Sequence, residues 1–321
     1  MPQRPDLGAL IAAARGRPVA PEEQLAIATS GGPDSLALLG LAASAYPGRI
    51  TALTVDHGLR AVSAAEAEGV AAQCAVRGIR HVTLRRDGPP ITANVQAAAR
   101  AARYALLASW CAAQGVALLL TAHHADDQAE TLLMRLNRGS GHDGLSGIRA
   151  ARQLARSVML VRPLLACRKA DLLALAEADG WRCVDDPSNR DPRHDRTGAR
   201  VLLAAAPGLD AGALAASAAH LAAEAQALDW AASAAWDGRV VAAGGELVMD
   251  ARGLPGALIH RLLMRAVRQV GGGEPRGQDV ARLAARLTDG KPATLAGVAA
   301  RPGAIWRIFP APPRQIRHQA G

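Results

Sequence analysis

The sequence has few aromatic residues and no long apolar run. Aromatic residues make up 2% of the 321 residues, although half of the chain is hydrophobic. Alanine supplies much of this hydrophobic fraction, which predicts helices that pack closely and gain little burial energy from each side chain. No apolar run approaches the length of a membrane-spanning helix. Charges also interrupt the apolar part of the N-terminus, unlike a secretory signal. We therefore expect a cytoplasmic protein with no membrane partner.

Paired cysteines and the common ATPase signature are also absent. The four cysteines lie far apart and form neither a CxxC motif nor a Cys/His ligand spacing. We expect them to be small core residues rather than disulfide partners, zinc ligands or iron–sulfur ligands. The sequence GxxxxGK[ST] does not occur, which argues against γ-phosphate transfer of the P-loop type.

The positive charge of the chain is concentrated near its C-terminus. The formal net charge is +9, and residues 251–321 hold 12 basic and three acidic residues, which accounts for the whole excess. A compositional preference for arginine would explain why only two of the basic residues are lysines. It does not explain the asymmetry along the chain. A localised basic segment is typical of a protein with a polyanionic partner, and we predict a nucleic acid.

Short apolar runs alternate with helical patterns in the first half of the chain. The predicted strands are 24–28, 50–55, 79–84, 116–121 and 158–161, and the predicted helices between them are 34–43, 63–77, 94–114 and 127–136. This alternation predicts an α/β fold with a doubly wound, Rossmann-like parallel sheet of five strands. Ligands in such folds bind outside the carboxyl ends of the strands, so we expect the chemistry in the loops that follow them.

The second half of the chain predicts a smaller domain. An Ala-rich helical segment runs from Pro207 to about Trp236, and short strands, two further helices and a terminal hairpin follow it. We predict a catalytic domain over 1–205. A helical linker and a small, basic, mainly helical α+β domain are predicted over 206–321.

The stretch Ser30-Gly31-Gly32-Pro33-Asp34-Ser35 follows the first strand and begins a helix. Glycines permit a close approach of the ligand, and proline suits the first helical turn. The free N–H groups of a helix start form an anion site, to which the two serines can add hydroxyl groups. The stretch resembles the pyrophosphatase loop of the N-type ATP pyrophosphatases, the PP-loop family, which cleave ATP between its α- and β-phosphates. The resemblance implies that residues 30–35 bind ATP and that Asp34 binds Mg²⁺, which explains a carboxylate beside a pyrophosphate.

Further stretches resemble one branch of this family, the tRNA(Ile)-lysidine synthases. The segment VDHGLR (55–60) resembles the part of the adenosine pocket that follows the second strand, which implies that Asp56 and His57 bind ATP. The segment ARAARYALL (99–107) resembles an RxxRY helix in which Arg100 and Arg103 share one face. The resemblance assigns both arginines to the side that faces the tRNA or the active site, and we predict that they bind tRNA. A solvated basic face is the alternative.

The segment TAHHADDQAET (121–131) follows the fourth strand. His123, Asp127 and Glu130 stand at i, i+4 and i+7, so that a helix would place them on one face. An acid-rich helix cap is the alternative for Asp126 and Asp127. The resemblance favours all three as catalytic residues, with Asp127 a second Mg²⁺ ligand. It also implies that Arg196 is catalytic. The Arg196–Arg200 run keeps both arginines of the family's motif but not its Asn and Ile.

The resemblance implies a complete reaction. The wobble cytidine of an isoleucine tRNA with a CAU anticodon attacks ATP, and free L-lysine then displaces AMP to give lysidine. We expect the basic C-terminal segment to hold the tRNA, with Arg261, Arg265 and Arg282 as candidates. The resemblance also makes a homodimer plausible. The alternatives are a tRNA-base thiolase of the same family, a pyrophosphatase that amidates small molecules, and a nucleic-acid-binding protein with a vestigial nucleotide site.

Overall fold

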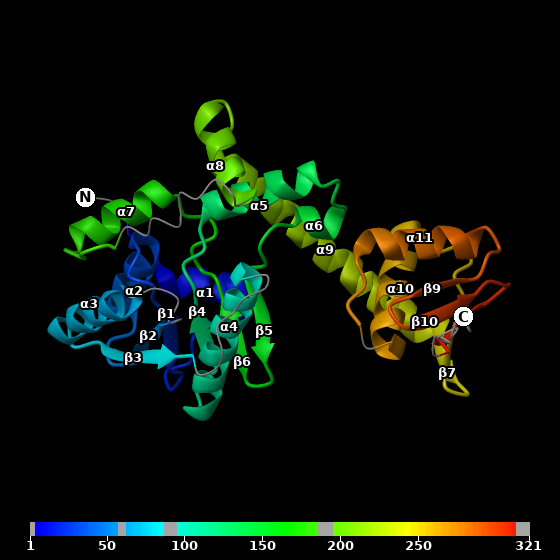
Figure 1. Cartoon of the computed structure of the whole chain (residues 1–321), viewed down its shortest axis with the longest axis horizontal. Coiled ribbons are helices and arrows are strands. Elements are labelled where there is room, and N and C mark those ends of the chain that lie inside the picture. The colour runs from blue at the N-terminus through cyan, green and yellow to red at the C-terminus, as the bar shows by residue number, and fades with distance from the viewer. Residues whose placement is uncertain (1–3, 57–61, 87–94, 185–194, 272, 313–321) are drawn as a thin grey trace, which may run out of the picture. The chain divides into compact units, whose positions relative to one another are not determined.

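The computed structural model describes residues 4–56, 62–86, 95–184, 195–271 and 273–312 (Figure 1). The chain divides into two compact units, Met1–Leu221 and Ala222–Gly321. The division falls within α9 (Ala211–Arg239), a single long helix that begins in the first unit and ends in the second. The boundary that we predict after residue 205 lies N-terminal to this helix.

The first unit contains a six-stranded sheet in the order β3-β2-β1-β4-β6-β5. Five strands are parallel, namely β1 (Leu25–Ala28), β2 (Ile50–Asp56), β3 (Arg80–Arg85), β4 (Leu118–Leu120) and β6 (Val158–Val161). They confirm the predicted doubly wound α/β fold. The edge strand β5 (Ala151–Ala155) is antiparallel to β6 and is missing from the prediction. Its polar residues and its register shift suit a strand at the solvated edge of the sheet. The strand therefore lacks the apolar run from which the other strands are predicted.

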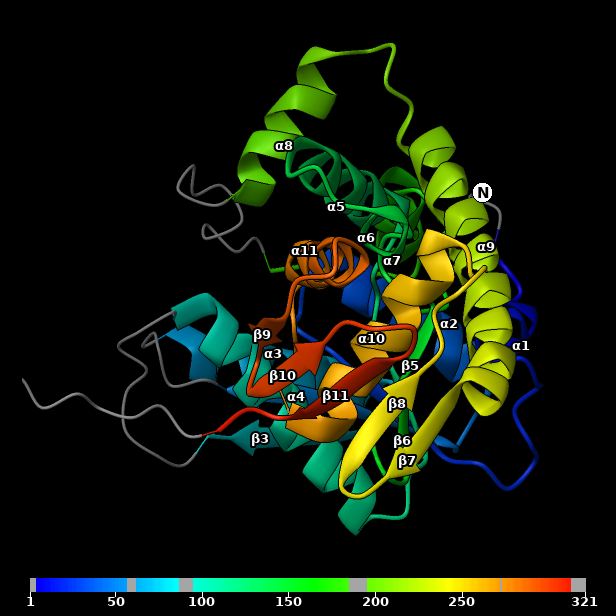
Figure 2. The same cartoon turned by 90° about the vertical axis from the view of Figure 1, so that its right-hand side faces the viewer.

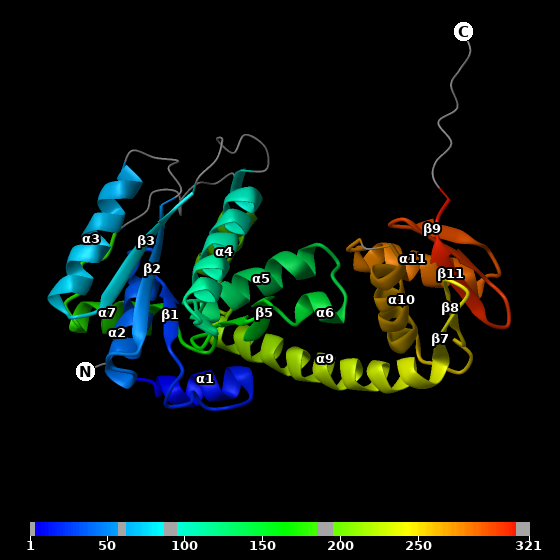
Figure 3. The ribbon, with the colours of Figure 1, turned by 90° about the horizontal axis from the view of Figure 1, so that it is seen from below.

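Helices cover both faces of this sheet. The helices of the unit are α1 (Leu7–Arg15), α2 (Pro33–Ala45), α3 (Val62–Val76), α4 (Val95–Ala113), α5 (Ala125–Asn137), α6 (His142–Leu145), α7 (Lys169–Ala178) and α8 (Asp195–Ala205). Side chains of α1, α2, α3 and α7 pack on one face of the sheet, around Ile27 and Leu120. Side chains of α4 pack on the other face, around Ala26 and Leu119 (Figure 3). Alternate residues of each strand thus serve two cores, which accounts for the continuous apolar strands.

The cysteines divide between core and surface. Cys74 and Cys111 are buried, one in each core, and burial raises the pKa of their thiols to about 11 and about 12. Cys167 is half-buried and Cys183 is exposed, so the predicted core role is wrong for Cys183.

The second unit is an α+β domain, as predicted. Its antiparallel sheet has the order β7-β8-β11-β10-β9. The strands are β7 (Val240–Ala243), β8 (Glu246–Met249), β9 (Ala293–Leu295), β10 (Val298–Arg301) and β11 (Trp306–Pro310), and the helices are α10 (Gly256–Gly271) and α11 (Gly277–Thr288). The apolar sides of both helices pack on the sheet (Figure 2). Residues 293–310 form three strands where the sequence predicts a two-stranded hairpin.

None of the helices in the described part of the chain is long and apolar enough to span a membrane.

We predict opposite effects on stability for alanine substitutions at two helical glycines. A Cβ atom at Gly40 of α2 would lie 2.8 Å from Asp179 Oδ2 and 2.9 Å from Trp181 Nε1, whereas Gly69 of α3 has no such neighbour within 4 Å. We expect Gly40→Ala to lower the free energy of unfolding by about 1–3 kcal/mol, because overpacking outweighs the helix propensity of alanine. Gly69→Ala should raise it by up to about 1 kcal/mol. Urea unfolding of both variants measures the difference. An equal increase in the free energy of unfolding in both variants would mean that α2 and α7 are loosely packed.

Candidate active site

The candidate active site lies where the strand order reverses. Strand β1 pairs with both β2 and β4, and Ile27 is in register with Leu120. The loops that leave the carboxyl ends of β1 and β4 are therefore neighbours, as expected for a ligand site in a doubly wound sheet. One loop carries the glycine-rich stretch, and the other carries two histidines and leads into the two aspartates of the first turn of α5.

The glycine-rich loop is tightly closed on itself. Gly31 has a φ of +83°, and a Cβ atom there would lie 3.1 Å from Val70 Cγ2, so the position requires glycine. Gly32 precedes the first turn of α2, and Pro33 and Asp34 lie within that turn. The Ser35 hydroxyl donates to Gly32 O at 2.9 Å and accepts from Ser30 N at 3.1 Å. This geometry leaves the first turn of α2 facing the site as an anion-binding helix start.

The centre of the site is the buried ring of His124, which the sequence analysis missed. Its Nε2 lies 3.6 Å from Asp34 Oδ2 and 3.5 Å from Asp127 Oδ2, and its Nδ1 lies 3.5 Å from Asp126 Oδ2. Burial by itself would lower the pKa of His124, but the surrounding carboxylates raise it to about 10. The imidazolium links the loop after β1 to the start of α5.

The two aspartates at the start of α5 have different partners. Asp126 Oδ2 accepts from the backbone N–H of Lys169 at 2.8 Å and so caps α7. The imidazolium of His124, whose Nδ1 lies 3.5 Å away, holds the pKa of Asp126 down at about 2. Asp127 Oδ2 accepts from the backbone N–H of His124 at 3.2 Å, and its Oδ1 lies 3.8 Å from Arg196. The cap interpretation therefore applies to both carboxylates, and it is compatible with a place in the site.

His123 does not share a helix with Asp127 and Glu130, as the predicted spacing required. Helix α5 begins at Ala125, so His123 precedes the helix and the i, i+4, i+7 argument does not apply to it. His123 instead lies between Thr121 Oγ1, 3.1 Å from its Nδ1, and Arg100, 3.5 Å from its Nε2. Burial and the neighbouring arginines lower the pKa of His123 to about 3, although Asp127 opposes them. The ring is therefore neutral at pH 7.

Glu130 is a buried carboxylate held by two arginines of α8. Its Oε1 accepts from Arg200 Nε at 2.6 Å, and its Oε2 lies 3.9 Å from Arg196 Nε. The side chain is 4% exposed, and burial raises the pKa of Glu130 although Arg200 opposes the shift. Arg200, which the sequence favours less than Arg196 as a site residue, thus makes the shorter contact with Glu130. The altered residues between Arg196 and Arg200 do not prevent both from reaching Glu130.

An arginine cluster surrounds Tyr104 on α4. The guanidinium groups of Arg100, Arg103 and Arg152 lie 5.2, 5.5 and 5.2 Å from the ring centroid. Burial by itself would raise the pKa of Tyr104, but Arg100, Arg103 and the buried Arg162 lower it below its ordinary value. The predicted pair of α4 is therefore part of a cluster of four arginines. Arg152 was missed because strand β5 was not predicted.

Two other parts of the predicted site are only partly visible. Asp56 ends β2, and its Oδ2 lies 4.0 Å from Arg85 Nε. His57 lies outside the described residues.

The three arginines proposed for tRNA in the second unit have unequal surroundings. Arg261 is 10% exposed and pairs with Asp229 at 2.9 Å, which favours a structural role. Arg265 lies 4.1 Å from the centroid of the Trp236 ring. Arg282 is 75% exposed and is the most accessible of the three for a partner.

The donor atoms suit a hard cation that arrives with a nucleotide. Asp34 Oδ1 is buried without a hydrogen-bond partner, and the Asp34 and Asp127 carboxylates approach the same nitrogen of His124. Among the described residues no group of three or more His, Cys, Asp or Glu side chains is arranged to hold a metal by itself. Mg²⁺ commonly takes one or two protein carboxylates and completes its shell with phosphate oxygens and water, so the two aspartates fit this ion.

Comparison with known proteins gives a consistent result. Residues 8–207 match the family model described as a PP-loop domain. The tRNA(Ile)-lysidine synthase of Novosphingobium aromaticivorans is 49% identical over 296 residues, which cover 91% of this chain and 90% of that protein. The enzyme of the same name from Zymomonas mobilis is 40% identical over 297 residues, with the same coverage.

A solved structure shares the fold of the chain. It is the U34-tRNA thiolase NcsA from Methanococcus maripaludis with its [4Fe-4S] cluster, and the TM-score is 0.54 at 18% identity. The match covers 67% of this chain and 76% of that one. At this identity the likeness shows the fold alone.

The contact between Glu130 and Arg200 predicts a coupled effect on stability. Arg200→Met should lower the free energy of unfolding by about 1–3 kcal/mol, because it leaves the buried carboxylate without its closest partner. Glu130→Gln in the same chain should recover part of that loss. Urea unfolding of the two single variants and the double variant measures the coupling. Arg168→Met, which breaks the exposed pair with Asp210, is the control and should cost less than about 1 kcal/mol. Additive losses at 130 and 200 would contradict the coupling.

Proposed function

The chain belongs to the PP-loop family and, within it, to the tRNA(Ile)-lysidine synthases. From this premise we propose that it attaches lysine to the wobble cytidine of an isoleucine tRNA with a CAU anticodon. The reaction is coupled to the cleavage of ATP to AMP and pyrophosphate. The observation that carries the proposal is 49% identity over nine-tenths of both chains, which includes both units of the structure.

In the first step the cytidine is adenylated. The C2 oxygen of the base attacks the α-phosphorus of ATP, the bond to the bridging oxygen breaks, and pyrophosphate leaves. The N–H groups at the start of α2 and the hydroxyls of Ser30 and Ser35 face the departing phosphates. When Mg²⁺ is bound by Asp34 and Asp127, it neutralises part of the charge on the pyrophosphate.

The arginine cluster supplies the other phosphate contacts, and His123 orients it. The pKa of His123 is about 3, so its ring is neutral, and its Nε2 accepts from the guanidinium of Arg100. The positive charge in this part of the site comes from Arg100, whose guanidinium lies beside that ring. Arg100 and Arg103 then contact phosphates of the tRNA.

In the second step the ε-amine of lysine attacks C2. The new carbon–nitrogen bond replaces the bond to the adenylate oxygen, and AMP leaves. The amine must first lose a proton, because an ordinary lysine ammonium has a pKa of about 10.4. Glu130 is the proposed acceptor, since burial raises its pKa and its Oε2 has no hydrogen-bond partner. Asp127 is the alternative, and Arg196 lies within reach of both carboxylates.

The thiolase alternative has less support. The thiolase named above is only 18% identical and holds a [4Fe-4S] cluster. In this chain Cys74 and Cys111 are buried in separate cores. A homodimer remains a prediction, which sedimentation would measure.

The direct test supplies the purified protein with ATP, Mg²⁺, labelled lysine and a panel of tRNAs. We expect label in the isoleucine tRNA with a CAU anticodon and an equal amount of AMP. Cleavage of ATP without incorporation of lysine into this tRNA would overturn the proposal.

Asp34→Asn should lower the rate of AMP formation by about 10²–10³-fold, because the helix start then lacks its charged metal ligand. The affinity for tRNA should stay nearly unchanged, since Asp34 is not a phosphate contact. Single-turnover AMP formation and filter binding of tRNA measure the two effects. Asp171→Asn makes the same chemical change in the first turn of α7 and is the control. Loss of both AMP formation and tRNA binding in Asp34→Asn, but not in Asp171→Asn, would indicate a folding defect rather than a catalytic role.

A further inference from the structure

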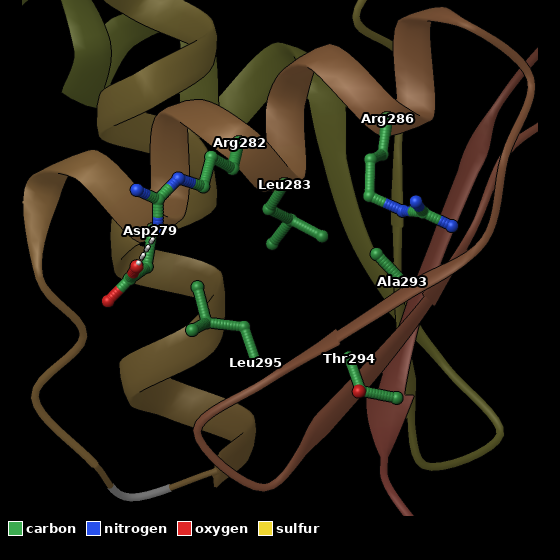
Figure 4. A pocket seen from close by; sticks show the side chains of 7 residues that line it. All are labelled: Asp279, Arg282, Leu283, Arg286, Ala293, Thr294 and Leu295. Atoms are coloured by element: carbon green, nitrogen blue, oxygen red, sulfur yellow. Dashed lines mark hydrogen bonds and ion pairs between the residues drawn. The ribbon is translucent and has the colours of Figure 1, made fainter.

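The second unit contains a pocket that the proposed reaction does not use. It lies between α11 and β9 and has a volume of about 170 Å³. Arg282 and Arg286 flank the pocket with Leu283 between them, and Thr294 and Leu295 line it from the side of β9 (Figure 4). All of these residues belong to one unit, so the pocket is complete within it.

The two arginines are oriented by their neighbours. They stand four residues apart on α11 and therefore share one face of the helix. Arg282 Nη1 donates to Asp279 Oδ1 at 3.1 Å. Arg286 donates from Nε and one Nη to the carbonyl of Pro292, at 3.2 and 2.9 Å. Both side chains are exposed, so each guanidinium is held in place and remains accessible to an anion.

The floor of the pocket is apolar. Leu283 is buried in the core of the second unit, and Leu295 packs against that core. Thr294 adds an exposed hydroxyl at the rim. Cations at the two sides, an apolar floor and a hydroxyl match a phosphate group attached to a sugar.

The size of the pocket favours part of a polymer over a free ligand. Pockets for whole small molecules usually hold about 300–1,000 Å³, and this one is smaller. The second unit contains 13 basic and eight acidic residues and so carries a net charge of +5. A polyanion is therefore attracted to the whole unit, and the pocket would take one of its repeating groups.

We propose that this pocket binds one ribose–phosphate group of the tRNA backbone. The phosphate lies between Arg282 and Arg286, and the ribose lies on Leu283 and Leu295. The inference rests on the proposed function, because it takes tRNA as the polyanion.

Replacing Asp279 tests the proposal, because a pocket that binds RNA and a purely structural ion pair predict different changes in the affinity for tRNA. Asp279 lines the same pocket and would repel a phosphate held by Arg282. If the pocket binds RNA, Asp279→Asn removes this repulsion and the affinity for tRNA increases. If the Asp279–Arg282 pair only stabilises the first turns of α11, the same change lowers the affinity or leaves it unchanged.

The experiment measures tRNA binding to the full-length protein at several salt concentrations. Arg282→Ala with Arg286→Ala should weaken binding about tenfold near 0.15 M salt, because both contacts with the phosphate and the counterion released by it are lost. The slope of log affinity against log salt should fall by about 0.7–0.9, since the pocket holds one phosphate. Arg268→Ala, at an exposed arginine of α10 paired with Glu274, is the matched control and should change the slope by less than half of that. Asp279→Asn should strengthen binding about twofold or more.

Other readouts separate the possible failures. If the wild-type chain neither binds tRNA nor forms lysidine, the proposed function itself is wrong. If the wild type does both and the double variant binds tRNA with unchanged affinity and slope, only the pocket proposal is overturned. Inorganic phosphate at millimolar concentration should not displace the tRNA. Displacement from the wild type but not from the double variant would assign the pocket to free phosphate. Circular dichroism and urea unfolding must show that each variant is folded.

Discussion

The buried ring of His124 is the contact on which the rest of the active site depends. It touches carboxylates from the first turns of α2 and α5. Three carboxylates so close together would repel one another and bind protons if no cation lay among them. The imidazolium supplies that charge from within the protein. Asp126 can then stay ionised and cap α7 through Lys169, so the same charge also fixes the helix that packs against α2.

The acidic and the basic residues of the site lie on different helices and strands. The carboxylates come from the N-terminal parts of α2 and α5, the helices that follow the two central strands, β1 and β4. The arginines come from the elements around them, namely α4, β5, α8 and the residue after β6. This arrangement places a region suited to a cation at the switch point and a region suited to phosphates beside it. His123 lies at the border between them, and its neutral ring adds no charge to either region.

The sequence predicts the central fold well because its signal is strong there. Five buried parallel strands and the helices between them follow from apolar runs and spacing, and the glycine-rich loop lies where a doubly wound sheet binds its ligand. The edge strand β5 was missed because an edge faces water and alternates weakly. His124 was missed for a different reason. Helical spacing groups only residues that lie on the same helix. His124 has an extended backbone, with φ −131° and ψ −179°, just before α5. Spacing on a helix says nothing about a residue that precedes it, and only the paired strands β1 and β4 reveal which histidine faces Asp34.

The charge count illustrates a similar limit. Counted from residue 251, the C-terminal segment holds the whole excess of +9, yet the second unit carries only +5. The difference arises because residues 222–250 hold five acidic residues and one basic residue. Arg252, Arg261 and Arg307 pair with Asp250, Asp229 and Glu246, all of which precede residue 251. A partly buried arginine with a carboxylate 2.9 Å away, such as Arg261, has little charge left to attract a polyanion. The attraction for tRNA must therefore come from arginines that extend into solvent. A charge count along the sequence identifies the domain, whereas the pairing in the structure identifies the residues.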